Sequence, residues 1–445
     1  MASMIRERLG RCCASILLRR RCVSMVSRQR CVSILFAAGL AGVATAASVA
    51  SAGTVPTGTP EEAGFSAERL ERVSEAVAKH IEAGDVAGAV TLVARRGRIV
   101  HFEAQGYADI ESQTPMRTDH IFRLASMSKP ITAAAIMMLV EEGEIRLSDP
   151  VSRFIPEFAS LDKVAGPRAD GEEGYDVVSA ARPITIHDLL THGSGLASGG
   201  LGARASGELA PRAPRDDLAR YIPKLAAVPL DFQPGTLWRY SGLAGFDVLS
   251  RVVEVVSGQT FDEFLEERLF APLGMPDTGF YFDGERTERV ATIYRRAEDG
   301  SLVPNEQQAL NRVYYSGAGG LASSAEDYLQ FAQMLLNGGE LDGRRYLGPR
   351  TVELMIANHT GDMVNGQFGR PARGMGFGLS VQVVQDPAAA GLAVSKGAYG
   401  WAGGTGVSFW IEPAEEMVTI YMVQGGSGGA LRAAFEYAVR QAIVD

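Results

Sequence analysis

The chain has few cysteines, and all four of them lie near its N-terminus, at Cys12, Cys13, Cys22 and Cys31. The rest of the sequence therefore cannot form a disulfide, a cysteine-ligated zinc site or an iron–sulfur cluster, and it offers no thiol nucleophile. Aromatic residues make up only 8% of the 445 residues and charged residues 21%, against 46% hydrophobic residues. These proportions exclude wholesale disorder and a polytopic membrane protein, and the length allows a large buried core.

Positive charge is concentrated in the first 31 residues, which hold eight Arg and one Glu. Because the formal charge of the whole chain is −9, the remaining residues carry −16, which argues against nucleic acid as a partner. An uncharged apolar run over residues 32–50 follows the basic stretch. This order is typical of a signal peptide, and we expect residues 1–52 to be removed during export to the periplasm or the extracellular space, with a linker over 53–62.

The alternative for this N-terminal segment is a single membrane anchor, since the apolar run is nearly long enough to span a bilayer. Gly, Ala, Ser and Thr dominate the run, however, which disfavours a stable membrane helix. We therefore expect no membrane span in the chain after cleavage.

Helix and strand patterns at the two ends of the remaining chain predict one shared sheet. Ser66 can cap an amphipathic helix that runs to about Ile81, and two strands follow over 89–94 and 98–104. Near the C-terminus the sequence predicts strands over 407–411 and 417–423 and a helix over 430–443. Terminal strands that frame a long, mostly helical middle indicate one antiparallel sheet built from both ends. Two stretches of the middle, 165–181 and 198–216, are expected to be surface loops.

Ser126 and Lys129 are the first candidates for a nucleophile and its base. An alcohol is almost fully protonated at neutral pH and needs a base beside it to attack a carbonyl. The apolar stretch 131–140 predicts a helix, and if Ser126 opens that helix, Lys129 lies on the same face within reach of the hydroxyl. Ser-x-x-Lys alone is a weak pattern, because a capped core helix with a solvated lysine contains the same residues.

Two other segments match nucleophile motifs, but neither fits its surroundings. Ser160 and Lys163 have the same spacing, yet the residues after them, 164–170, predict a loop and no helix. Residues 425–429 match Gly-x-Ser-x-Gly, a motif whose triad runs in the order serine, acid, histidine. All six histidines precede Ser427, so we interpret this segment as a glycine-rich turn.

Ser126 to Lys129 is one of several segments that together resemble the penicillin-recognising serine hydrolases, in particular class C β-lactamases and family VIII carboxylesterases. The other segments occur in the same order along the chain: 184–196 (ITIHDLLTHGSGL), 232–241 (FQPGTLWRYS), 272–278 (PLGMPDT), 317–324 (GAGGLASS) and 400–404 (GWAGG). The resemblance implies one β-lactamase/transpeptidase-like domain of the α/β (α+β) class over 63–445. In that fold an antiparallel sheet is flanked by helices, and the active site lies between the sheet region and a mostly helical region.

By this resemblance Ser126 is the residue that becomes acylated, Lys129 is its proton partner and Tyr240 is a second general base. A buried lysine or a phenolate beside a cation could each accept the serine proton, and the sequence leaves open which one does. The family's oxyanion hole implies the backbone N–H groups of Ser126 and Gly404. Adjacent glycines let a carbonyl oxygen approach the strand closely, and the alternative for Gly403 and Gly404 is a strand bulge.

Two departures from the β-lactamase motifs indicate the class of substrate. Gly242 stands where β-lactamases have the asparagine of Tyr-x-Asn, and Trp401-Ala402-Gly403 replaces Lys-Thr-Gly. Both changes remove polar partners of a β-lactam, whereas Trp401 offers an apolar wall, as in family VIII carboxylesterases. The alternative for Trp401 is core packing. We expect a substrate pocket that includes Trp401, Gly403 and Gly242.

The sequence therefore predicts a serine hydrolase that forms an acyl-enzyme, most simply a carboxylesterase for short-chain acyl esters. The alternatives are a class C-type β-lactamase, a D-amino-acid peptidase or an acyltransferase of the same fold, or a non-catalytic cell-wall-binding homologue. The expected partner is a small ester or amide substrate. His187 and His192 are expected to cap or pack, and we predict neither a cofactor nor a metal site.

Overall fold

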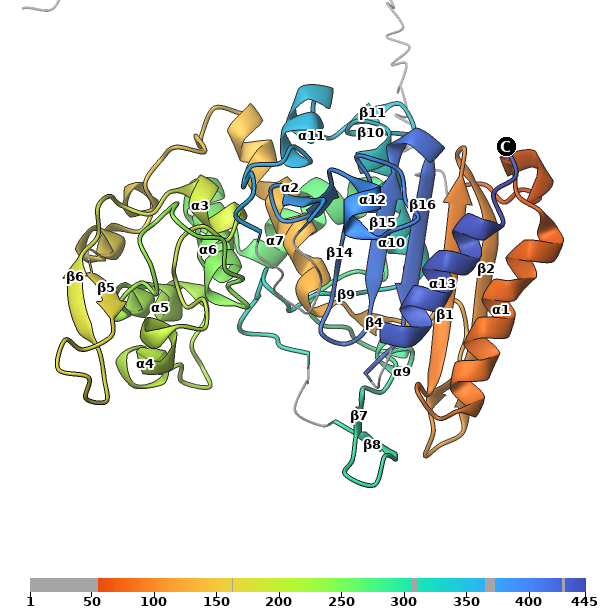
Figure 1. The fold of residues 1–445 in the computed structure, drawn as a ribbon, viewed down its shortest axis with the longest axis horizontal. Coiled ribbons are helices and arrows are strands. Elements are labelled where there is room, and N and C mark those ends of the chain that lie inside the picture. Colours follow the sequence, from red (N-terminus) through yellow and green to blue (C-terminus); the bar gives the residue numbers. More distant parts are fainter. Residues whose placement is uncertain (1–54, 162, 306–309, 365–372, 426–428) are drawn as a thin grey trace, which may run out of the picture. The chain divides into compact units, whose positions relative to one another are not determined.

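The computed structural model of the chain describes residues 55–161, 163–305, 310–364, 373–425 and 429–445, so the predicted signal peptide lies outside the described residues (Figure 1). Its central feature is an antiparallel sheet in the order β12-β13-β14-β15-β16-β1-β2-β3. The strands of this sheet are β1 (Gly88–Arg95), β2 (Arg98–Asp109), β3 (Thr114–Pro115), β12 (Met375–Phe377), β13 (Gln382–Val384), β14 (Tyr399–Ala402), β15 (Ser408–Glu412) and β16 (Met417–Met422).

The two ends of the sequence meet in the middle of this sheet, which confirms the prediction. Strand β1 pairs with β2 on one side and with β16 on the other, in a register that places Val90 opposite Met422. Every residue of β1, β15 and β16 is buried, because helices cover both faces of the sheet.

Helices α1 (Ala67–Glu82) and α13 (Gly429–Gln441) lie side by side on one face (Figure 1). Ser66 caps α1 as expected, accepting a hydrogen bond from the Arg69 N–H at 3.3 Å. Helices α2 (Ser128–Glu141) and α10 (Ala325–Leu336) cover the other face. Alternate residues of β1 face the two layers, so that Val93 packs with α1 and α13 while Leu92 packs with α2 and α10.

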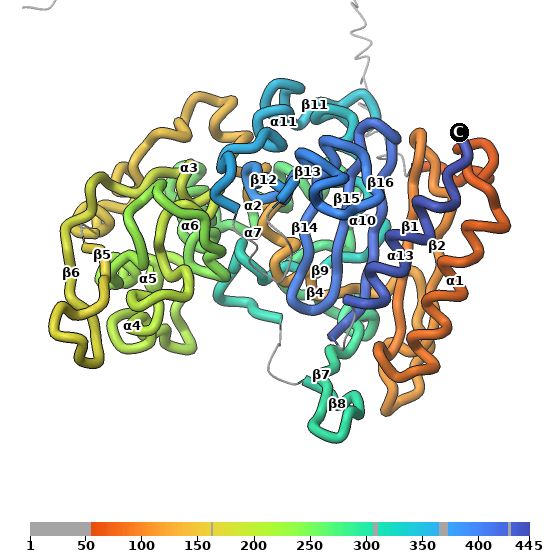
Figure 2. The backbone as a smooth tube through the Cα atoms, viewed as in Figure 1, coloured from red at the N-terminus to blue at the C-terminus, as the bar shows by residue number. Residues whose placement is uncertain are grey.

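The middle of the chain forms the mostly helical region, which the tube in Figure 2 follows from yellow to green. Its helices are α3 (Ile186–Leu190), α4 (Leu201–Leu209), α5 (Leu218–Tyr221), α6 (Ala244–Ser257), α7 (Phe261–Leu265) and α8 (Ala271–Leu273). The remaining elements are α9 (Glu285–Glu288), α11 (Pro349–Met355), α12 (Pro387–Ala390), β4 (Phe122–Arg123), β5 (Lys163–Gly166), β6 (Asp176–Ser179), β7 (Tyr294–Arg296), β8 (Leu302–Pro304), β9 (Ala322–Ser323), β10 (Glu340–Leu341) and β11 (Arg344–Arg345).

Both segments expected to be surface loops contain regular structure, so these two predictions were wrong. The first, 165–181, contains β6, which pairs with β5 as a hairpin. The second, 198–216, contains α4. All four residues of β6 are exposed, and α4 buries only Gly202, so neither segment shows the apolar periodicity that reveals an element. A Cβ at position 202 would lie 1.9 Å from the Pro229 carbonyl oxygen, so glycine allows α4 to approach this backbone.

Residues 56–58, within the segment predicted as a linker, pair with Ile99 at the start of β2. Thr57 forms a bridge with Ile99, whose N–H donates to the Pro56 carbonyl at 2.8 Å. Among the described residues no helix is both long enough and apolar enough to cross a membrane.

Candidate active site

Ser126 lies at the junction between the short β4–β9 pair and helix α2. The Leu124 N–H donates to the Leu321 carbonyl at 2.8 Å, and the chain then enters a 3-10 turn, η2 (Ala125–Met127), that leads directly into α2. Ala125 has a φ of +44°, a left-handed conformation that costs a non-glycine residue about 1 kcal/mol. The strand pair therefore holds the backbone just before Ser126 in a conformation that it would not adopt by itself.

Lys129 lies in the first turn of α2 with its side chain completely buried. Its Nζ is 3.2 Å from the Ser126 Oγ, and it also donates to the carbonyl oxygens of Gly242 and Ala318, each at 2.7 Å. These three contacts match the three N–H groups of an ammonium. The structure thus brings together the two side chains that the Ser-x-x-Lys spacing placed on one helix face.

Burial lowers the pKa of Lys129 to about 7, because water is excluded from the charged form. The carboxylate of Asp247 opposes this shift, since a nearby negative charge favours the ammonium. At neutral pH the unprotonated Lys129 amine, which can accept a proton, is therefore populated. An ordinary surface lysine would be almost entirely charged.

Tyr240 approaches Ser126 from the loop that precedes α6. Its hydroxyl donates to the Ser126 Oγ at 2.7 Å, and the Lys129 Nζ lies 5.0 Å from the centre of its ring. Burial raises the pKa of Tyr240, and its hydrogen bonds with Ser126 and Trp401 only oppose that shift. The phenol is accordingly protonated at neutral pH and acts as a hydrogen-bond donor.

His192 packs beneath Tyr240, with the two ring centres 4.5 Å apart. It is buried, and its Nδ1 accepts a hydrogen bond from the Ser241 N–H at 3.2 Å. Burial lowers its pKa well below the usual value, so the ring is neutral. As the sequence indicated, His192 is a packing residue, and its contacts fix the loop that carries Tyr240.

Asp247 on α6 belongs to the site, although the sequence analysis did not identify it. Its carboxylate accepts hydrogen bonds from the Tyr314 hydroxyl at 2.8 Å, the Ser316 hydroxyl at 2.6 Å and the Ala318 N–H at 3.2 Å. Burial raises its pKa. Asp247 thus holds the segment whose Ala318 carbonyl binds Lys129. An acidic residue among the apolar residues of a core helix was the available signal.

Replacing Asp247 with asparagine is expected to move the acidic limb of the pH–rate profile to lower pH. The change removes the negative charge that favours the Lys129 ammonium, so the lysine pKa falls and the unprotonated amine persists to lower pH. We expect a shift of about half to one pH unit in kcat/KM. Asp327→Asn is the matched control, because this buried carboxylate bonds Thr278 and the Asp277 N–H, away from Lys129. An unmoved limb in Asp247→Asn, or an equal shift in the control, contradicts the prediction.

The glycines after β14 lie against the backbone that precedes Ser126. A Cβ at Gly403 would come within 2.2 Å of the Leu124 carbonyl oxygen, so only glycine allows this approach. A Cβ at Gly404 would meet no atom within 4 Å, and the Gly404 N–H has no hydrogen-bond acceptor among the described residues. The contribution of this N–H to an oxyanion hole, which the family resemblance implies, remains a prediction.

Ser126 opens into a cleft of about 400 Å³. The cleft is lined by Arg123, Ala125, Ser126, Arg212, Leu243, Asp247, Leu310, Asn311, Tyr314, Ser316, Ala318, Gly319, Gly320 and Leu321. Trp401, Gly403 and Gly242 are not among these lining residues: Gly242 binds Lys129 through its carbonyl, and Trp401 packs on Tyr240 with ring centres 5.5 Å apart. Contact of these three residues with substrate remains a prediction.

The second Ser-x-x-Lys match does not form such a site. Ser160 ends a 3-10 turn and Lys163 begins β5, with both residues exposed. Residues 426–428 of the Gly-x-Ser-x-Gly match lie outside the described residues.

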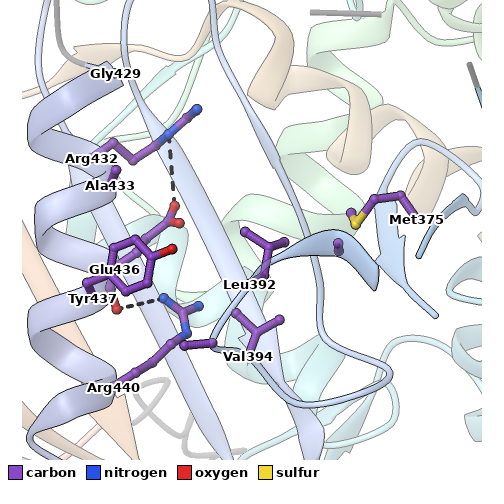
Figure 3. A pocket seen from close by; sticks show the side chains of 11 residues that line it. Met375, Leu392, Val394, Gly429, Arg432, Ala433, Glu436, Tyr437 and Arg440 are labelled. Atoms are coloured by element: carbon purple, nitrogen blue, oxygen red, sulfur yellow. Dashed lines mark hydrogen bonds and ion pairs between the residues drawn. The ribbon is translucent and has the colours of Figure 1, made fainter. Parts of the chain in front are cut away.

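A separate hollow of about 200 Å³ lies between α13 and residues 390–394 (Figure 3). Its charged side chains have partners in the protein: Arg432 lies 3.9 Å from Glu436, and the Arg440 Nε donates to Glu412 at 2.8 Å. Neither Ser126, Lys129 nor Tyr240 reaches it, so it lies apart from the candidate active site.

Comparison with known proteins agrees with this geometry. The profile of the Beta-lactamase family matches residues 73–443. The chain belongs to this family. Protein Rv1367c of Mycobacterium tuberculosis is 38% identical over 359 residues, which are 77% of this chain and 87% of that protein. Esterase EstB of Burkholderia gladioli is 35% identical over 388 residues, 81% of this chain and 90% of the esterase.

The solved structure of EstCE1, described as a hydrolase with promiscuous acyltransferase activity, shares the fold of this β-lactamase family member. It is 28% identical with a TM-score of 0.71, and the match covers 85% of this chain and 99% of EstCE1. The fold class and the family resemblance predicted from the motifs are therefore confirmed. The protein is a serine hydrolase of the β-lactamase family.

Proposed function

We propose that the protein is a carboxylesterase that cleaves short-chain acyl esters through an acyl-enzyme on Ser126. The observation that carries the proposal is the buried Lys129, 3.2 Å from the Ser126 Oγ, whose pKa of about 7 makes it a base at neutral pH. A nucleophilic serine needs such a neighbour, and a base is most effective when its pKa lies near the working pH.

In the first half of the reaction Lys129 accepts the hydroxyl proton as the Ser126 Oγ attacks the ester carbonyl. The N–H groups of Ser126 and Gly404 stabilise the oxyanion. The alkoxide of the substrate then leaves and takes a proton from the Tyr240 hydroxyl, which lies 2.7 Å from the Ser126 Oγ. Lys129 returns to Tyr240 the proton that it accepted from Ser126. The second half repeats these transfers with water as the nucleophile, and the acid is released.

Two observations support an ester as the substrate: the site lacks the polar groups that bind a β-lactam, and the chain is similar to an esterase. Trp401-Ala402-Gly403 provides neither the cation nor the hydroxyl that Lys-Thr-Gly presents to a β-lactam carboxylate, and Gly242 provides no side-chain amide. EstB, at 35% identity over most of both chains, is an esterase by name. These observations favour an ester over a β-lactam as substrate.

The test compares a series of p-nitrophenyl esters, from acetate to octanoate, with a chromogenic cephalosporin. We expect kcat/KM to be highest for one of the shorter esters and at least about 100-fold lower for the cephalosporin, because Gly242 and Trp401-Ala402-Gly403 supply neither the amide nor the cation and hydroxyl that hold a β-lactam in place. Faster turnover of the cephalosporin would contradict the ester assignment and support the β-lactamase alternative.

A further inference from the structure

Two arginines line the cleft that contains Ser126, and neither has an acidic partner among the described residues. Arg123 is half-buried, and its Nε is inaccessible to water and has no hydrogen-bond partner in the structure. Burial lowers its pKa, and no carboxylate among the described residues opposes the shift. The guanidinium stays charged all the same, since arginine starts from a pKa above 12.

Arg212 is the second of these arginines. Its side chain is exposed, and the guanidinium carbon lies 4.5 Å from the centre of the Tyr314 ring, which orients it at the cleft wall. The one carboxylate of the lining, Asp247, already accepts hydrogen bonds from Tyr314, Ser316 and the Ala318 N–H. Both of its oxygens thus accept hydrogen bonds from other donors, and Asp247 forms no ion pair with either arginine.

Arg123 and Arg212 form no ion pair within the described residues, whereas several other arginines bind acidic side chains, as Arg182 does with Asp188 and Arg289 with Asp277. Beyond its first 31 residues the chain carries a formal charge of −16, so carboxylates are plentiful. Two arginines beside the nucleophile that have no acidic partner among the described residues indicate a binding site for an anion.

Apolar side chains lie next to these charges. Leu243 lines the cleft with 64% of its surface exposed, and Leu310 and Leu321 line it as well. A ligand that fills this cleft thus combines hydrocarbon with one anionic group.

We propose that the cleft selects esters that carry a carboxylate, and that Arg123 and Arg212 bind this carboxylate while Ser126 attacks the ester bond. A carboxylate accepts two parallel hydrogen bonds from a guanidinium, which would give the half-buried Arg123 an anionic partner that it does not have among the described residues. A neutral ester leaves that guanidinium unpaired and is selected against. The proposal rests on the ester hydrolysis proposed above and names its substrate class.

The carboxylate could belong to either half of the ester, and two pairs of substrates separate these sources. Mono-p-nitrophenyl adipate carries it on the acyl side, and its methyl ester is the neutral partner. 4-Carboxyphenyl butyrate carries it on the alcohol side, again with the methyl ester as its neutral partner. For each pair the measured quantity is the ratio of kcat/KM for the anionic ester to kcat/KM for the neutral one, with phenol release as the readout.

Arg123→Gln is expected to lower this ratio about 10-fold or more for one of the two pairs, mainly through a higher KM for the anionic ester. Arg123→Lys should restore part of the ratio, because lysine supplies the positive charge but not the planar guanidinium that binds a carboxylate through two hydrogen bonds. Arg212→Gln, a change of an exposed side chain, should lower the ratio for the same pair. Arg350→Gln is the control, since Arg350 is exposed on α11 beside Glu353 and its loss removes the same charge away from the cleft.

Ratios that stay unchanged in both Arg123→Gln and Arg212→Gln, while the neutral esters are still cleaved, overturn the carboxylate proposal and leave the esterase intact. A fall of similar size in Arg350→Gln also overturns it, because the effect is then one of net charge. Failure of the folded wild-type protein to cleave either member of either pair overturns the proposed function together with this inference.

Discussion

Ser126→Ala is expected to reduce kcat for p-nitrophenyl butyrate on the order of 10⁴-fold or more, because the acyl-enzyme cannot form without the Oγ. The fold should persist, since Ser126 is only partly buried and its loss leaves no cavity of consequence. The measurement is steady-state turnover of purified protein together with a thermal melt of both forms.

The protein contains its own control for this substitution. Ser160→Ala removes the serine of the second Ser-x-x-Lys match, which lies exposed at the end of a 3-10 turn, and it should leave turnover unchanged. A fluorophosphonate probe should label wild-type protein on Ser126, as shown by peptide mapping, and should not label Ser126→Ala. Residual turnover above about 10% in Ser126→Ala, or a label on another serine, would assign the nucleophile elsewhere.

Lys129→Met is expected to reduce kcat/KM about 10² to 10⁴-fold while preserving a side chain of similar length in a buried position. In the wild-type protein the same group should set the acidic limb of the pH–rate profile. Because Lys129 acts as a base only when unprotonated, kcat/KM should be high above pH 7 and fall as the pH drops through about 7. The profile is measured from pH 5 to 9 with a neutral ester.

Lys163→Met is the matched control, since this exposed lysine at the start of β5 has the same spacing from a serine. It should retain both the rate and the profile of the wild type. A wild-type profile that is flat between pH 5.5 and 8.5, or full activity of Lys129→Met, would show that another group accepts the serine proton.

The part of the site that could be predicted from sequence is the part formed by neighbouring residues. Ser126 and Lys129 are three positions apart at a helix start, so helical geometry alone places them together. Tyr240 came only from the family resemblance, because nothing in the spacing connects it with Ser126 across 114 residues. Asp247 was missed, since its function depends on tertiary contacts with residues 314–318 that no local pattern reveals.

The fold shows the same difference between what local sequence patterns predict and what only the structure reveals. The strands and helices at both ends were predicted because their apolar residues alternate or recur every three to four positions and pack into the two faces of one sheet. Strand β6 and helix α4 were not predicted, because one is fully exposed and the other buries a single glycine. The positions of Arg123 and Arg212 in one cleft also required the structure, since 88 residues separate them in the sequence.

The pairing of Val90 with Met422 has a consequence for how the molecule assembles. Strand β1 emerges early from the ribosome, but its neighbour β16 is translated more than three hundred residues later, so the sheet stays open at its centre until synthesis is nearly complete. Contacts so distant along the polypeptide slow folding, because a long loop must close before they form. The backbone N–H and C=O groups on this edge of β1 therefore gain their partners only after the C-terminal strands have been made.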